Sequence, residues 1–195
     1  MRSQCHRHWQ FTRGNKALGL APASFTSMAT KNDFTPADWN TLRNTQFLVG
    51  FATAMASPSG LGTVKELFAL SQGIIQNQSS DIPLIRDLTS AAEMQEAQNS
   101  LKQSLGGVQA KPTADDLRRR ALEQAQSAIA CLQAQASPQE TDAYRRMLCG
   151  IAEKVANAAR EGGFLGLGGT QVSKEERAFL DQLRTALQLE QVKSA

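Results

Sequence analysis

The chain has 195 residues, enough for one domain, and its net charge of +3 comes entirely from one end. Residues 1–27 hold four of the 21 basic residues and no acidic one, so residues 28–195 are nearly neutral, with 17 basic against 18 acidic residues. A domain without excess positive charge lacks the electrostatic footprint of a nucleic-acid-binding protein, and we expect no nucleic-acid partner.

Residues 1–27 differ in composition from the rest of the chain and form a leader, but they lack the continuous apolar stretch of a secretory signal. Their basic, Ser- and Thr-bearing composition fits a transit peptide, or a translated upstream region with Met28 as the true start, and composition favours the second. We therefore expect residues 1–30 to be disordered and residues 31–195 to fold as a single domain.

The residue types available argue against an enzyme. Both histidines, His6 and His8, lie in the leader, so the domain cannot build a Ser-His-Asp or Cys-His mechanism or a His-ligated metal site. Cys131 and Cys149 lie on separate predicted helices without C-x-x-C spacing, a pattern typical of buried, reduced thiols in a cytosolic protein. The prediction is a cytoplasmic protein with no catalytic residues, no metal and no cofactor.

The first two helices are predicted by strong local signals. Thr35-Pro36-Ala37-Asp38 opens the first, with Thr35 as N-cap and Pro36 in the first turn. Residues 47–56 are apolar nearly all round, as in a central, buried helix. The segment is too short to cross a membrane, and no other segment has a better apolar stretch for crossing one. The second helix spans about residues 62–77. Its apolar residues form one stripe at helical spacing, as a core-facing side does: Val64, Leu67, Phe68, Ile74 and Ile75.

The third helix is predicted to start with Asp81 as its cap and to extend to Leu105, with a kink or break near Thr89-Ser90. Three further helix starts follow at Thr113, at Ser137-Pro138, and at Ser173 with Glu176 as a capping box. No segment shows sustained alternation rich in Val, Ile and Thr. We predict an all-α bundle of five to six antiparallel helices.

The two halves of the chain suggest an internal duplication of helix-loop-helix units. Leu48-Val49-Gly50-Phe51-Ala52 matches Leu148-Cys149-Gly150-Ile151-Ala152, and a glycine-containing loop and another helix follow each. Because glycine weakens a helix, Gly50 and Gly150 suggest close contact between helices. The alternative is chance similarity among Ala-rich helices.

The most unusual stretch is a glycine-rich loop that joins the last two predicted helices. Its eight residues are Gly162, Gly163, Phe164, Leu165, Gly166, Leu167, Gly168 and Gly169. Surface loops are normally polar, so the three apolar side chains either fold back on the helix ends or bury against a partner, a ligand or a lipid surface. Nucleotide motifs fail here, because Gly169 stands where a phosphate-binding loop needs lysine. A calcium site lacks loop carboxylates.

Residues 150–180, GIAEKVANAAREGGFLGLGGTQVSKEERAFL, resemble the helix-loop-helix of the tellurite-resistance TerB-like helical family, over about residues 144–187. The resemblance implies an all-helical fold, and a loop in which an Asp beside the glycine takes part in cation binding. In this chain Arg160-Glu161-Gly162-Gly163 occupies that position, and the loop is longer and more apolar. The chain is also similar to uncharacterised bacterial helical proteins with a GGFLG-x-GG loop.

The resulting hypothesis is a non-enzymatic protein that acts through a protein partner or self-association, using the loop Gly162–Gly169. Two alternatives use the same loop. One is a TerB-like cation-binding stress or sensor domain. The other is a peripheral lipid-binding protein that inserts Phe164, Leu165 and Leu167.

Overall fold

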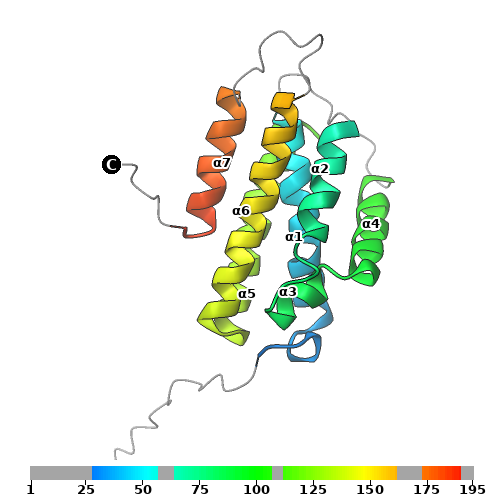
Figure 1. Cartoon of the computed structure of the whole chain (residues 1–195), viewed down its shortest axis with the longest axis vertical. Coiled ribbons are helices and arrows are strands. Elements are labelled where there is room, and N and C mark those ends of the chain that lie inside the picture. The colour runs from blue at the N-terminus through cyan, green and yellow to red at the C-terminus, as the bar shows by residue number, and fades with distance from the viewer. Residues whose placement is uncertain (1–27, 57–63, 107–111, 162–172, 190–195) are drawn as a thin grey trace, which may run out of the picture.

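The structure is a computed structural model that describes residues 28–56, 64–106, 112–161 and 173–189. Within these ranges it is a bundle of α-helices without a strand (Figure 1). The elements in chain order are a short 3₁₀ helix at Lys31–Asp33, α1 at Pro36–Met55, α2 at Val64–Ile75, α3 at Pro83–Leu88, α4 at Ala91–Gly106, α5 at Ala114–Gln135, α6 at Pro138–Glu161 and α7 at Lys174–Ala186. The prediction of an all-α bundle is confirmed.

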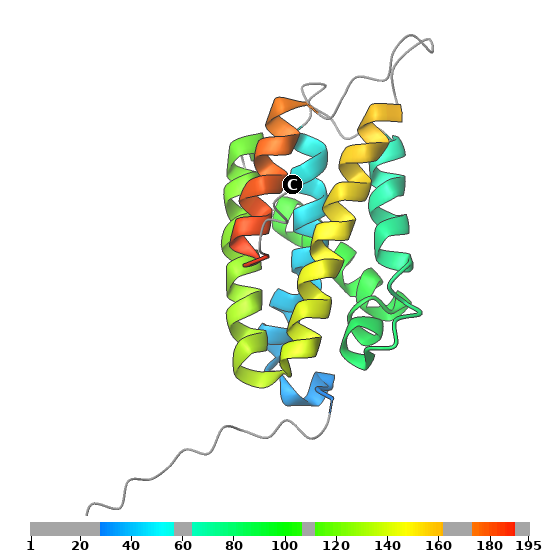
Figure 2. The same cartoon turned by 60° about the vertical axis from the view of Figure 1, so that its left-hand side comes forward.

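Helix α1 is the centre of the bundle and packs against α2, α4, α5, α6 and α7. Figures 1 and 2 show it enclosed by these neighbours, with α7 beside α5 and α6, and α2 on the other side of α6. Leu42, Val49 and Ala52 are completely buried along its length. The expectation that the apolar segment 47–56 is central and buried is confirmed, since every residue of it is buried except the half-buried Leu48, Phe51 and Met55.

The helix starts follow the capping signals of the sequence. Thr35 Oγ1 accepts the backbone N–H of Asp38 at 3.2 Å, and Pro36 is the first residue of α1. The same bond joins Thr113 to Asp116 at the start of α5, and Ser173 to Glu176 at the start of α7. Each bond satisfies a backbone donor that the first turn leaves free, so these boundaries are fixed locally.

The third predicted helix is divided where a break was expected. Helix α3 ends at Leu88 and α4 begins at Ala91. Between them, the Thr89 hydroxyl donates a hydrogen bond to the Ile85 carbonyl at 2.8 Å. This division brings the described helices to seven α-helices rather than five to six. The N-cap of α3 is Ile82 rather than Asp81, because Pro83 occupies the first helical position and the cap is the residue before it.

The two glycines of the proposed duplication lie in different surroundings. A Cβ on Gly50 would overlap the side chain of Leu70, so this glycine allows α1 and α2 to approach closely. A Cβ on Gly150 would meet nothing within 4 Å, and Gly150 is exposed. The expectation of close helix contact is therefore confirmed for Gly50 and wrong for Gly150, because that side of α6 faces solvent.

The fold begins earlier than residue 31. Ala29 is buried, and its backbone N–H donates to Oε1 of Glu140 at 2.7 Å. Phe34 is also buried, and its ring lies against Trp39 with the ring centroids 5.8 Å apart. The boundary predicted at residue 30 is therefore too late, since this small apolar patch closes one end of the bundle. Residues 1–27 lie outside the described ranges.

Candidate functional site: an exposed apolar face on helix α2

The predicted interaction loop Gly162–Gly169 lies outside the described residues. The structure does describe the helices that it joins, α6 ending at Glu161 and α7 beginning at Lys174. The capping box predicted for the second of these helices is present, with the Ser173 N–H donating to Glu176 Oε2 at 2.7 Å. The predictions about Phe164, Leu165 and Leu167 remain predictions.

A different apolar surface is present on α2. Four large apolar side chains are exposed among the described residues, and three belong to this helix: Leu67 at 42%, Phe68 at 64% and Ile75 at 43% exposed. They occupy one side of α2, because residues separated by seven or eight positions lie on the same face of a helix. We call these three residues the α2 outer face.

The prediction of a core-facing stripe is wrong for these three residues and confirmed for Ile74, which is completely buried. The other buried residues of α2 are Glu66, Ala69, Leu70 and Gly73, and this side of the helix packs against α1 and α6. Small residues at two of these positions allow close packing: a Cβ on Gly73 would lie 3.4 Å from the Cα of Ile151. The side of α2 that carries the small residues Ala69 and Gly73 packs against the neighbouring helices, and the side that carries the α2 outer face is exposed.

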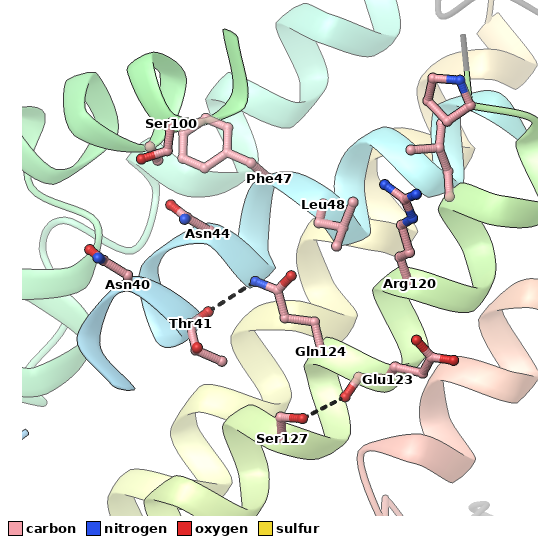
Figure 3. Close-up of a pocket in the computed structure, with 13 residues that line it drawn as sticks. Asn40, Thr41, Asn44, Phe47, Leu48, Ser100, Arg120, Glu123, Gln124 and Ser127 are labelled. Atoms are coloured by element: carbon pink, nitrogen blue, oxygen red, sulfur yellow. Dashed lines mark hydrogen bonds between the residues drawn. The ribbon is translucent and has the colours of Figure 1, made fainter. Parts of the chain in front are cut away.

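A groove runs along α1, between α4 and α5, with a volume of about 510 Å³ (Figure 3). Phe47 and Leu48 of α1 form part of its apolar lining, while the polar side chains at its edges include Asn40, Arg120 and Gln124. Gln124 reaches across it to the Thr41 carbonyl at 3.4 Å. This hydrogen bond crosses the groove, whose lining is more apolar than polar.

Two carboxylates are buried in different electrostatic surroundings. Glu93 of α4 receives Arg43 Nη1 of α1 at 3.1 Å and Lys31 Nζ at 2.5 Å. Burial alone raises the pKa of Glu93, but hydrogen bonds from Lys31 and Arg43 outweigh it and hold the pKa below its usual value. The Trp39 indole N–H adds to this lowering, although it makes no hydrogen bond within the usual geometric limits. Among the described residues, the partners that hydrogen-bond the Glu140 carboxylate are neutral groups.

The described cysteines are poor nucleophiles. Burial raises the pKa of the Cys131 thiol to about 11, and burial together with the neighbouring Glu153 carboxylate raises the pKa of Cys149 to about 11. A thiol with such a pKa is almost entirely protonated at neutral pH and attacks slowly. Glu153 also accepts from Arg184 Nη2 at 2.7 Å, in an ion pair between α6 and α7.

Within the described ranges, no three His, Cys, Asp or Glu side chains gather in a way that could hold a metal ion. None of the helices in these ranges is both long and apolar enough to cross a membrane. No protein-family model, curated protein or solved structure matches the chain. The function has to be argued from the residues themselves.

Proposed function

We propose that the protein is a non-enzymatic binding protein that recognises a protein partner through the α2 outer face. The observation that carries this proposal is the exposure of Leu67, Phe68 and Ile75 on one side of one helix. Single exposed apolar residues are normal on protein surfaces, but a cluster of large ones is typical of an interaction site.

The chemistry of the α2 outer face favours an apolar helix as partner. Ile75 follows Phe68 by seven residues and Leu67 by eight, and anchors two turns apart on one side are a pattern by which one amphipathic helix packs along another. Ser71 lies between Leu67 and Ile75 on the same side, and its hydroxyl donates a hydrogen bond to the Leu67 carbonyl at 3.2 Å. A small residue with a satisfied hydroxyl leaves room for a partner side chain between the two apolar anchors.

The α2 outer face also has a rigid support. Helix α2 is fixed from behind by Gly50 against Leu70 and by Gly73 against Ile151, two close approaches to α1 and α6. A surface held in one conformation loses little entropy when a partner binds. The loop Gly162–Gly169 remains the second proposed element of this interface, from its sequence alone.

Site-specific photo-crosslinking tests the proposal. A photo-reactive amino acid replaces Phe68 in one variant and the exposed Gln76 in a matched control, and both proteins are crosslinked in their native cells. We expect a specific protein adduct from position 68, lost when Leu67 and Ile75 are changed to Ser, and none from position 76. Equal labelling at the two positions would contradict the proposal.

Two further measurements separate the alternatives. Sedimentation velocity of the wild type and the Leu67→Ser, Ile75→Ser variant distinguishes self-association from binding to another protein. Co-sedimentation with phosphatidylglycerol vesicles tests lipid attachment, and binding there that depends on Phe68 would replace the protein partner with a membrane surface. Repeating both with Phe164→Ser, Leu165→Ser shows whether the glycine loop contributes.

A further inference from the structure

The buried carboxylate of Glu140 has an unusual set of partners. Its side chain has no exposed surface. Oε2 accepts the backbone N–H of Ser137 at 2.9 Å and the Ser137 hydroxyl at 2.7 Å, and Oε1 accepts the backbone N–H of Ala29 at 2.7 Å. The bond from the Ser137 N–H and the reciprocal bond from the Glu140 backbone N–H to Ser137 Oγ at 3.3 Å form the capping box of α6. The bond from Ala29 joins this helix to a residue 111 positions away.

All three of these partners are neutral groups. Among the described residues no lysine or arginine forms an ion pair with Glu140, whereas the buried Glu93 has two cationic partners. Burying a carboxylate without a counter-ion is costly, and the positive end of the α6 dipole offsets only part of that cost. Hydrogen-bond donors therefore surround the Glu140 carboxylate, but none of those in the described residues carries a positive charge.

The neighbouring chain offers one way to supply that charge. The Ala29 nitrogen already lies at hydrogen-bond distance from Oε1, with its side chain buried. Met28, the residue before it, is 40% exposed and makes no part of the core. If the chain began at Ala29, the same nitrogen would be an ammonium group, and its remaining protons would face the solvent where Met28 now stands.

We infer that the working form of the protein begins at Ala29, and that the α-ammonium group of Ala29 forms an ion pair with the buried carboxylate of Glu140. The present bond from a neutral N–H to the carboxylate is already charge-assisted, and an ammonium donor would add an opposite charge at the same distance. The carboxylate of the capping box would thus also bind the N-terminal ammonium group of the processed chain.

The covalent step is hydrolysis of the peptide bond between Met28 and Ala29. Water adds to the Met28 carbonyl carbon, the carbon–nitrogen bond breaks, methionine or the peptide ending in Met28 leaves with a carboxylate, and the Ala29 nitrogen takes up protons. Two routes give the same amine: initiation at Met28 followed by a methionine aminopeptidase, which accepts small second residues such as alanine, or cleavage of a longer chain by a protease.

Intact-mass spectrometry of the protein purified from its native source tests the N-terminus directly. We expect the mass of residues 29–195 with a free amine. A chain that retains Met28 or any earlier residue, or that carries an acetyl group on Ala29, would overturn the inference. Changing the Met1 codon distinguishes the routes, because initiation at Met28 would survive the change and cleavage of a chain begun at Met1 would not.

Thermal unfolding tests the ion pair. Chains that begin at residue 27, 28 or 29 are released from a fusion whose protease leaves no extra residue. The chain beginning at Ala29 is expected to melt about 3 °C higher than the other two, the shift that corresponds to about 1 kcal/mol in a domain of this size. In Glu140→Gln this difference is expected to disappear.

Glu176 provides the matched control. It is the equivalent buried residue in the capping box of α7, and it accepts the Ser173 N–H at 2.7 Å. Glu176→Gln should therefore lower the melting temperature of all three chains equally and leave the difference between them unchanged. An identical melting temperature for the three wild-type chains, or a difference that persists in Glu140→Gln, would contradict the ion pair.

Discussion

Helices α1 and α2 follow one another in the chain and are both rich in apolar residues, but they are buried in opposite ways. Helix α1 packs against five other helices, and even its polar Arg43, Thr45 and Gln46 are buried. Helix α2 packs mainly on α6 and α1, burying Glu66 while Phe68 points outward. The position of a helix in the bundle, more than its own composition, decides which of its residues are buried.

The largest expected effect comes from removing the same side chain on each helix. Phe47 of α1 is 7% exposed and Phe68 of α2 is 64% exposed. Phe47→Ala should lower the free energy of unfolding by about 3 kcal/mol or more, because it leaves a cavity, and Phe68→Ala should change it by less than about 0.5 kcal/mol. Urea denaturation measures both. Comparable losses would mean that Phe68 is covered in solution.

The buried charge of α1 gives the next largest effect. Glu93→Gln leaves Arg43 buried without its anionic partner and should cost about 2 kcal/mol of stability. The lowered pKa of Glu93 also sets the sign of its pH dependence: the stabilisation is complete above the unfolded pKa and is lost as the pH falls through the folded value.

Denaturation at falling pH measures this effect, and Glu93→Gln should remove its contribution to the acid loss. Lys31→Met is the control. Lys31 contacts the same carboxylate, but its side chain is 58% exposed, so this change should cost less than about 1 kcal/mol. A loss as large as that of Glu93→Gln would show that the exposed cation, rather than Arg43, neutralises the site.

The smallest effect distinguishes the two glycines. Gly50→Ala places a methyl group against Leu70 and should lower the stability by about 1 kcal/mol as α2 is displaced. Gly150→Ala places a methyl group in open space on α6 and should raise the stability by about 0.5–1 kcal/mol, through helix propensity alone. Thermal unfolding of the two variants checks both signs. Equal shifts would restore the equivalence of the two positions.

Features fixed by short-range chemistry could be predicted from the sequence. Thr35-Pro36, Thr113 and Ser173 cap the helices that they were expected to cap, because each bond spans only three residues. The break at Thr89 was also foreseen. Local signals of this kind need no knowledge of the surrounding fold.

The orientation of α2 could not be predicted in the same way. The spacing of Leu67, Phe68 and Ile75 indicates one face of a helix, but not whether another helix lies against that face. Gly73 was the missed signal, since this glycine allows a close approach to Ile151, although the helical Gly150 allows none. The hydrogen bond from Ala29 to Glu140 joins residues far apart in sequence, so no local sequence pattern could predict it.

The raised pKa values of Cys131 and Cys149 have a practical consequence for following the proposed interaction. With a pKa of about 11, about one thiol in ten thousand is ionised at pH 7, so a maleimide dye reacts with these cysteines very slowly. A chain beginning at Ala29 contains no other cysteine. Phe68→Cys would then carry a single fluorophore on the α2 outer face, and its emission would report whether that surface becomes covered.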